Sequence, residues 1–225
     1  MTLNIPVIRL LVIKDWQLFQ KQLALYVLAG IVALCFLGLA RPWAFYVGSL
    51  MLIIVMVSIA CFSISTSLVT ERKEKTLAFV MSLPVSPLDF TLAKLIGNFI
   101  TFAVPFLVIL GGTLAVVLTT PLPDGLVVYS LLIFSYILFA FCLSLAVAMS
   151  VESEGWATFA MIGSMVMINP FIMAMSQIPE INDRVSVDAI VWTPQALGML
   201  AALLLLSAAI VCVTAWVHAR KPAFY

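Results

Sequence analysis

Residues 70–89 read TERKEKTLAFVMSLPVSPLD and form the densest cluster of charge in the chain. Long apolar runs precede and follow this segment, so we expect it to be a loop outside a bilayer. Within it, residues 76–83 predict a short helix, with Leu77, Val80 and Met81 on one face. We expect Pro84 to end this helix, because the residue before a proline is pushed out of the helical region. A simple bundle of membrane helices does not need such a segment, which makes it the most informative part of the sequence.

The composition of the whole chain is that of a membrane protein. Of its 225 residues, 64% are hydrophobic and only 9% are charged, whereas about 25% are charged in a typical soluble domain. Six charge-free runs each come close to or exceed the ~20 residues that cross a hydrocarbon core. These runs are residues 22–40, 42–70, 95–123, 125–151, 155–179 and 189–217. They predict an all-α membrane protein with six transmembrane helices in a single domain, rather than the short alternating segments of a membrane barrel.

The distribution of Lys and Arg predicts the orientation of the chain. An even number of spans puts both termini on one side, and nine of the eleven basic residues fall on that side. These nine are Arg9, Lys14, Lys21, Arg72, Lys73, Lys75, Lys94, Arg220 and Lys221, against Arg41 and Arg184 on the other side. The positive-inside rule therefore places both termini in the cytoplasm. We expect a multi-pass protein of the bacterial cytoplasmic (inner) membrane, and a net charge of +1 gives no indication of a nucleic-acid partner.

The N-terminal residues 6–22 show the pattern of an amphipathic helix. Ile8, Val12, Trp16, Phe19 and Leu23 recur at helical spacing and form one apolar stripe, from which the neighbouring basic residues are excluded. This pattern predicts an interfacial helix that lies at the cytoplasmic headgroups of the membrane lipids, anchored by its tryptophan. The alternative is that the helix simply extends the first span into the cytosol.

Residues 170–192, before the last span, depart from a simple membrane crossing. Asn169 and Pro170 interrupt the fifth apolar run, because proline removes a backbone donor and kinks or ends a helix. The chain then stays apolar, turns polar from residue 177 to 188 and becomes apolar again. We expect an external re-entrant segment here. The alternative is one kinked span followed by a surface loop.

Polar side chains inside the predicted spans are candidates for a transport path. We single out Ser58 and Ser65 from the second span and Asn169 from the fifth. Ionisable residues are missing at mid-membrane depth, which argues against proton relays and favours an apolar or amphipathic substrate. Small polar residues can equally serve as packing contacts between helices. The four cysteines all fall inside predicted spans, which suggests packing rather than disulfides or a metal site.

The charged loop resembles a known family of transporters. Glu71-Arg72, Leu83-Pro84 and Lys94 resemble the region between the second and third spans of type-2 ABC exporter permeases. Lys75-Thr76 stands where that family commonly has Gly-Thr, a minor departure. The chain length, the six spans, the helix before the first span and the broken segment before the last are also similar to the family. The resemblance covers most of the chain in its layout but only residues 71–97 in its motif.

The resemblance implies that the chain is the transmembrane subunit of an ATP-driven exporter rather than an enzyme. Such permeases pair with a second copy or a sister permease and bind two cytoplasmic ABC ATPase subunits. ATP and Mg would bind to the ATPase, so no cofactor and no metal are expected in this chain. Residues 71–89 would form the coupling loop, whose short helix docks on the ATPase. The residues implied in coupling are Glu71, Arg72, Thr76, Leu77, Phe79, Val80, Met81, Leu83 and Pro84. In agreement, the sequence contains no Gly-rich phosphate loop with Lys-Ser/Thr.

Three alternatives stay open at this point. A haem-exporter-type permease subunit of cytochrome c maturation has a similar length and number of spans. An intramembrane enzyme would need catalytic side chains in or near the spans, and the only nearby acidic pair, Glu152 and Glu154, is typical of a solvated turn. A passive scaffold or channel would leave the coupling-like segment without a role. The substrate is not specified by any of these patterns.

Overall fold

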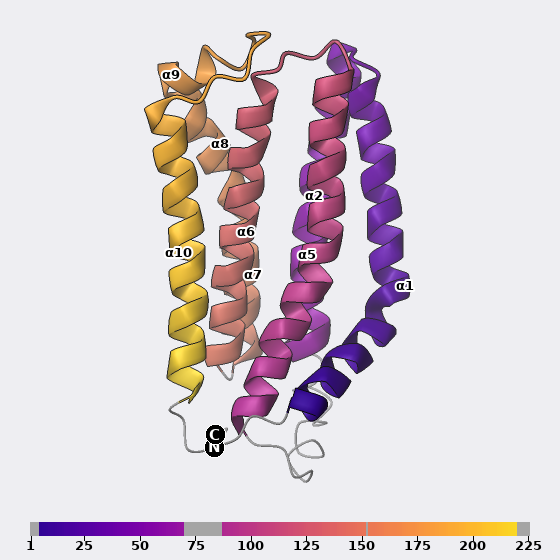
Figure 1. The fold of residues 1–225 in the computed structure, drawn as a ribbon, viewed down its shortest axis with the longest axis vertical. Helices are drawn as coiled ribbons and strands as arrows, with labels where there is room; N and C mark the ends of the chain where they lie inside the picture. The colour runs from indigo at the N-terminus through magenta and orange to yellow at the C-terminus, as the bar shows by residue number, and fades with distance from the viewer. Residues whose placement is uncertain (1–4, 70–86, 152, 220–225) are drawn as a thin grey trace.

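The computed structural model describes residues 5–69, 87–151 and 153–219. Figure 1 shows a bundle of long helices that run roughly along one axis. In chain order these are α1 (Ile5–Gly38), α2 (Pro42–Ile64), the π-helix η1 (Ser65–Val69), α5 (Pro87–Thr119), α6 (Leu126–Ser150), α7 (Glu154–Val166), α8 (Ile168–Ser176), α9 (Pro179–Asn182) and α10 (Pro194–Ala219). The described ranges contain no strand, and the predicted all-α fold class is confirmed.

Six helical stretches are long and apolar enough to cross a membrane, as predicted. They are Ile5–Gly38, Pro42–Leu68, Thr91–Thr119, Leu126–Ser150, Glu154–Ser176 and Pro194–Val217. α1 begins and α10 ends at one end of the bundle, where η1 also ends and α5 begins (Figure 1). We call this the loop end, because segment 70–86 joins η1 to α5 there. The opposite end, which carries the α1–α2 and α5–α6 connections, is called the turn end.

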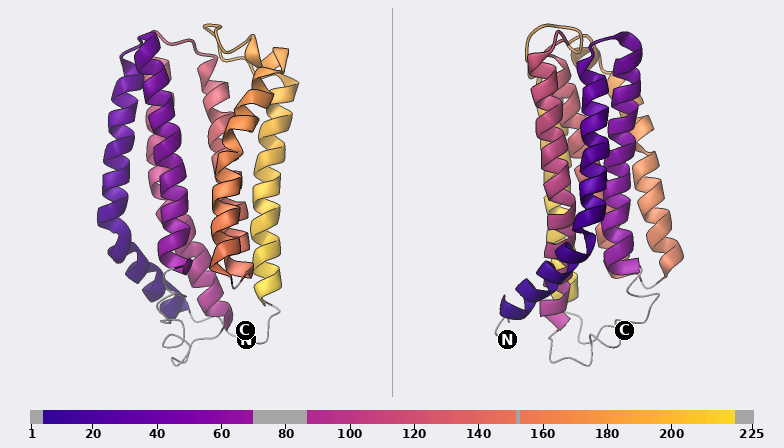
Figure 2. Two further views of the ribbon diagram at one scale, coloured as in Figure 1. Left: turned by 180° about the vertical axis from the view of Figure 1, so that it is seen from behind. Right: turned by 90° about the vertical axis from the view of Figure 1, so that its right-hand side faces the viewer.

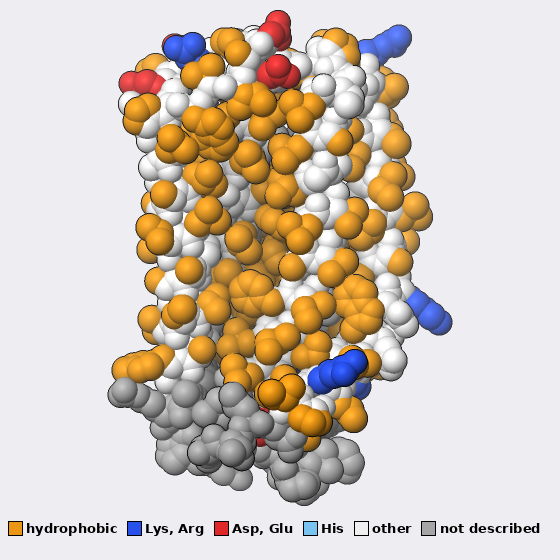
Figure 3. All heavy atoms as spheres, in the orientation of Figure 1, with side chains coloured by type: hydrophobic (Ala, Val, Ile, Leu, Met, Phe, Trp, Pro, Cys, Tyr) orange, Lys and Arg blue, Asp and Glu red, His pale blue; other side chains and the backbone are white. Residues whose placement is uncertain are grey.

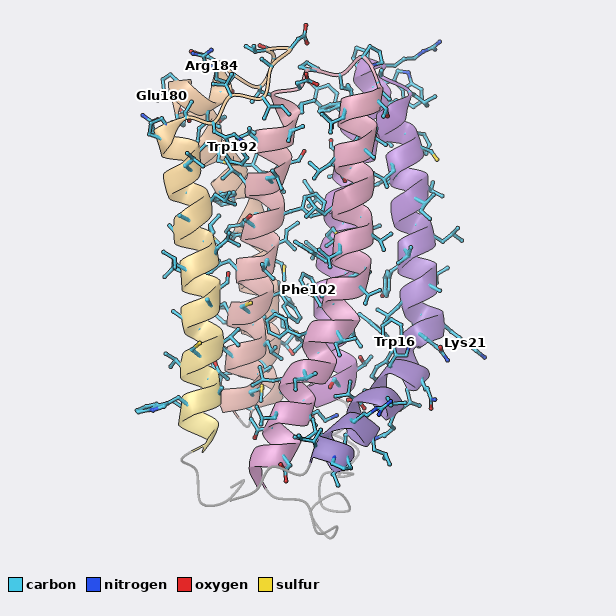
Figure 4. All side chains as sticks on the ribbon, in the orientation of Figure 1. Trp16, Lys21, Phe102, Glu180, Arg184 and Trp192 are labelled. Carbon is cyan, nitrogen blue, oxygen red and sulfur yellow. The ribbon has the colours of Figure 1, made fainter. Side chains whose placement is uncertain are left out.

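The centre of the bundle is filled by aromatic side chains of α5 and α6. The Phe102 and Phe141 side chains are fully buried, and their rings stack with centroids 4.0 Å apart. One turn further along α5, Phe106 meets Phe134 edge to face at 5.6 Å. Phe102 lies between the two helices in Figure 4. Such ring pairs bury large apolar areas and prefer these geometries, so they fix how α5 packs against α6.

The first half of α1 differs in direction from the second. Figure 2 shows that the part before the bend runs at an angle to the rest of the helix, and Figure 4 labels Lys21 near that bend. The predicted apolar stripe faces the protein: Leu23 is 3% exposed, and Phe19 meets Phe62 of α2 with ring centroids 5.8 Å apart. α1 is continuous through this bend, from Ile5 to Gly38. The interfacial position of residues 6–22 stays a prediction.

The fifth span is broken between α7 and α8, close to the predicted interruption. The helix breaks at Met167, three residues before Pro170. Pro170 has no N–H to donate to the carbonyl of Val166, so the helical ladder is interrupted there. α8 then continues toward the turn end (Figure 1). This arrangement matches the simpler alternative of a kinked span, and the re-entrant position of residues 170–192 stays a prediction.

The segment after α8 packs onto the α5–α6 connection at the turn end. The backbone N–H of Gly125 donates to the carbonyl oxygen of Val187 at 2.9 Å. A Cβ at Gly125 would overlap the carbonyl oxygen of Arg184. Glycine is therefore required for the close approach of these two backbones.

Gly48 of α2 permits the close packing of α1 against α2. A Cβ built there would lie 2.7 Å from the backbone nitrogen of Leu37 and 3.0 Å from the carbonyl oxygen of Ala33. We expect Gly48→Ala to lower the free energy of unfolding by about 1–3 kcal/mol, because one backbone must move away from the other. Thermal unfolding of the purified protein in detergent measures this change.

The matched control for Gly48 is Gly111→Ala in α5. A Cβ at Gly111 meets no atom within 4 Å, so this control gains helix propensity without a clash. Equal melting temperatures for the two variants would contradict the packing argument.

Candidate functional site

Buried polar side chains gather at the loop end, where α1, η1 and α5 converge. We call them the loop-end polar cluster. Its members are each at most 4% exposed: Asp15, Ser63, Ser67, Asp89, Thr91, Lys94, Asn98 and Thr101. Polar groups buried in an apolar bundle are stable only when they find hydrogen-bond partners. The described residues contain no buried side-chain nitrogen or oxygen atom without such a partner.

An ion pair joins α1 to α5 inside this cluster. The Lys94 Nζ atom donates to the Asp15 Oδ2 atom at 3.0 Å, and the two side chains are 4% and 6% exposed. Burying two charges has a large desolvation penalty, which their attraction offsets only while they remain paired. Removing either partner would leave the other charge buried, at a cost of about 3–5 kcal/mol.

Asn98, one helical turn after Lys94, joins α5 to η1. Its Nδ2 atom donates to the Ser67 Oγ atom at 3.0 Å and to the Lys94 carbonyl oxygen at 2.8 Å. One turn further, the hydroxyls of Thr101 and Ser63 lie 2.6 Å apart. Two side-chain contacts at consecutive turns therefore fix the end of α2 and η1 against the start of α5.

The π-helix η1 ends the second span immediately before segment 70–86. Thr66 Oγ1 donates to the Phe62 carbonyl oxygen at 2.7 Å at the point where the α-helix passes into the wider turns. Single π-turns are rare and occur frequently at functional sites. In this chain the π-turn places Ser67 within reach of Asn98.

The start of α5 carries residues that suit a helix N-terminus. The helix begins at Pro87, with Asp89 in its first turn. An acidic side chain at this position is favourable because the N-terminus of a helix carries partial positive charge.

The predicted coupling residues cannot be placed, because all of them lie in segment 70–86, outside the described residues. They are Glu71, Arg72, Thr76, Leu77, Phe79, Val80, Met81, Leu83 and Pro84. Their role in coupling stays a prediction. The residues on either side of the segment belong to η1 and α5, which carry most of the loop-end polar cluster.

The three candidate path residues are not brought together into one site. Ser65 of η1 donates from Oγ to the Met161 Sδ atom of α7 at 3.9 Å. Ser58 is half-buried on α2, whereas Asn169 is exposed on α8. The hydrogen bonds that join described residues do not link these three side chains, and their role in transport stays a prediction.

Sequence reasoning missed Asp15, although a signal for it was present. Asp15 lies three residues after Val12 and four before Phe19, so it shares a helix face with the apolar stripe. A carboxylate on a face that packs against protein needs a charged or hydrogen-bonding partner. In the sequence, Lys94 contributes to the orientation and to the family motif, and neither use indicates a buried partner. The structure buries it against Asp15.

An open apolar groove of about 420 Å³ runs between α6 and α10. It lies in the half of the bundle near the loop end, because it extends to the last residues of both helices. Its apolar lining includes Leu143, Ala146, Val147, Leu206, Ile210 and Val213. Ser150 and Thr214 are the polar residues among those that line it, and none of the lining residues is charged.

Comparison with protein families gives one match. A family model described as ABC-2 family transporter protein matches residues 40–201, which is well over half of the chain. The chain belongs to the ABC-2 transporter family. A search of curated proteins and a search of solved structures returned no match.

The family membership confirms the resemblance found in the sequence. This ABC-2 family chain is a multi-pass membrane permease domain, the transmembrane subunit of an ABC transporter. The match begins just before α2 and ends within α10, so it includes both helices that adjoin segment 70–86. Members of the family act as transport subunits, which favours transport over the scaffold and intramembrane-enzyme alternatives.

The contacts of Asn98 predict that replacing it by alanine lowers the stability of the protein. Asn98→Ala would leave the buried Ser67 hydroxyl without its partner, and we expect a loss of about 1–3 kcal/mol in the free energy of unfolding. Asn169→Ala is the matched control, because Asn169 is exposed. Thermal unfolding in detergent compares the two variants, and an Asn98 variant as stable as the Asn169 variant would contradict the assigned contacts.

Proposed function

We propose that this chain is the permease subunit of an ATP-driven exporter that moves an apolar or amphipathic substrate out of the cytoplasm or inner leaflet. ATP hydrolysis takes place on separate cytoplasmic ABC ATPase subunits, which hold ATP and Mg. The observation that carries the proposal is the ABC-2 family match across a bundle with six candidate spans.

The surroundings of segment 70–86 support its proposed role as the coupling loop. The segment leaves η1 after Val69 and enters α5 at Pro87, and the Asn98–Ser67 hydrogen bond ties these two elements together. A displacement of the loop by an ATPase would therefore act on the second and third spans together. A loop held on only one side would move a single helix.

The distribution of charge supports an apolar or amphipathic substrate. On the face drawn in Figure 3, Lys, Arg, Asp and Glu side chains lie near the two ends, and hydrophobic side chains cover the surface between them. The groove between α6 and α10 likewise has no charged lining residue. A strongly charged substrate would find no compensating groups on these surfaces.

The exposed helices support pairing with a second permease, either another copy or a sister subunit. In an apolar 18-residue stretch of the sixth span only 11% is buried within the described chain, and in the corresponding stretch of the fifth span 22%. Their remaining apolar surface must contact lipid or another membrane protein. We further propose that the loop end faces the cytoplasm of a bacterial inner membrane, because the described basic residues Arg9, Lys14, Lys21 and Lys94 lie in that half of the molecule.

Affinity purification of the chain from its native cell, in mild detergent, tests the proposal. We expect a stoichiometric ABC ATPase among the partners identified by mass spectrometry. A known permease complex, carried through the same procedure, shows whether such assemblies survive it. The proposed function would be contradicted if the control complex kept its ATPase while this chain purified without one.

If segment 70–86 is the coupling loop, charged substitutions on its apolar face should weaken ATPase binding. Leu77→Asp or Phe79→Asp would place a charge in an apolar docking surface, which costs more than the 1.4 kcal/mol that corresponds to tenfold in affinity. We therefore expect the affinity for the ATPase to fall by about tenfold or more in a pull-down titration.

Ala189→Asp is the matched control for the loop variants. It introduces the same charge at an exposed position at the turn end, so binding of the ATPase should be unchanged. If both loop variants bound the ATPase with wild-type affinity, Leu77 and Phe79 would not belong to the docking surface.

A further inference from the structure

We propose that the buried Asp15–Lys94 ion pair positions the first half of α1 as a moving part of the coupling apparatus. It holds residues 5–21 against the start of α5, so that this part of α1, η1 and the start of α5 move as one body. The inference rests on the proposed function for the source of the movement, because the ATPase would drive it through segment 70–86.

The first half of α1 has one apolar face that the described residues leave uncovered. It runs at an angle to the remainder of the helix (Figure 2). Leu10, Ile13 and Leu18 on its outer face are 68%, 43% and 59% exposed. On the inner face, the Asp15 Oδ2 atom lies 3.0 Å from the Lys94 Nζ atom.

The ion pair is continuous with the contacts that hold the ends of segment 70–86. Lys94 accepts a hydrogen bond at its carbonyl oxygen from Asn98 Nδ2, which also donates to Ser67 of η1. Asp15, Lys94, Asn98 and Ser67 thus connect α1, α5 and η1 through side-chain contacts between buried residues. A movement of η1 or of the start of α5 would therefore be transmitted to α1 through these contacts.

Because both charges are buried, we expect the Asp15–Lys94 contact to stay closed throughout the transport cycle. Opening it during the transport cycle would leave the Asp15 carboxylate buried without its counter-charge, which is strongly unfavourable. Apolar residues of similar volume could supply comparable stability to a buried ion pair. What the ion pair adds is a fixed partner and distance for α1, which is why we assign it a positioning role.

A distance measurement between spin labels tests this role in the permease–ATPase complex in lipid nanodiscs. Labels go on cysteines at Leu10 of α1 and Ile96 of α5, which are 68% and 41% exposed, after the four native cysteines have been replaced. Singly labelled samples identify any distance between permease copies. In the wild type we expect one narrow distance that is the same without nucleotide and after trapping with ATP and vanadate.

The decisive variant removes both charges together. Asp15→Asn with Lys94→Met removes both charges of the ion pair. Thermal unfolding, measured in parallel, shows that the variant is folded. We expect loss of the single narrow Leu10–Ile96 distance. The charge swap Asp15→Lys with Lys94→Asp should restore it. The matched control is Glu180→Gln with Arg184→Met, which neutralises exposed charges at the turn end and should keep the wild-type distance.

Two results would overturn the proposal. One is a folded double-neutral variant that keeps the wild-type distance, and the other is a wild-type distance that changes on vanadate trapping. The comparison without nucleotide needs no ATPase, so it tests the ion pair by itself. Failure of the proposed function shows separately, as a wild-type preparation without a co-purifying ATPase and without vanadate-sensitive ATP hydrolysis.

Discussion

The pairing of buried charge at the loop end constrains the rest of this structure. Asp15 and Lys94 lie on helices that are otherwise strongly apolar, and each is nearly inaccessible to solvent. Two purely apolar helix faces can slide or rotate against each other at little cost in free energy, because neighbouring hydrocarbon contacts resemble one another. A buried ion pair admits one partner at one distance. The register of α1 on α5 is therefore fixed where the two helices carry their charges, and the adjoining Asn98 contacts extend that constraint to η1.

The sequence predicted the parts of the fold that follow from length and hydropathy. Charge-free runs of sufficient length located six spans, and Pro170 marked the break in the fifth, because proline acts through its own backbone. The family motif in residues 71–97 identified the class of transporter. Each of these features depends on residues close together in the chain, which a single sequence displays directly.

The loop-end polar cluster could not be assembled from the sequence, because its contacts join distant residues. Asp15 and Lys94 are separated by 79 positions, and Ser67 and Asn98 by 31. Helical spacing shows that Asp15 shares a face with apolar residues, but it cannot show which helix packs there. The π-turn at η1 was equally hidden, since no breaker residue marks it, although it determines that Ser67 reaches Asn98.

The helices fall into two groups, and the loop-end contacts lie within the first of them. α1 and α2 pack closely with each other and α1 with α5, while α6 packs with α7 and α10. Side-chain hydrogen bonds join members of the same group, such as Asn98–Ser67 in the first and the hydroxyls of Ser144 and Ser164, 2.7 Å apart, in the second. The longer contact from Ser65 Oγ to Met161 Sδ, at 3.9 Å, joins the first group to the second. Between the groups lies the stacked aromatic contact of Phe102 with Phe141. This ring stack and the Ser65–Met161 contact hold the two groups together. The first group, which adjoins both ends of segment 70–86, is therefore packed directly against the second.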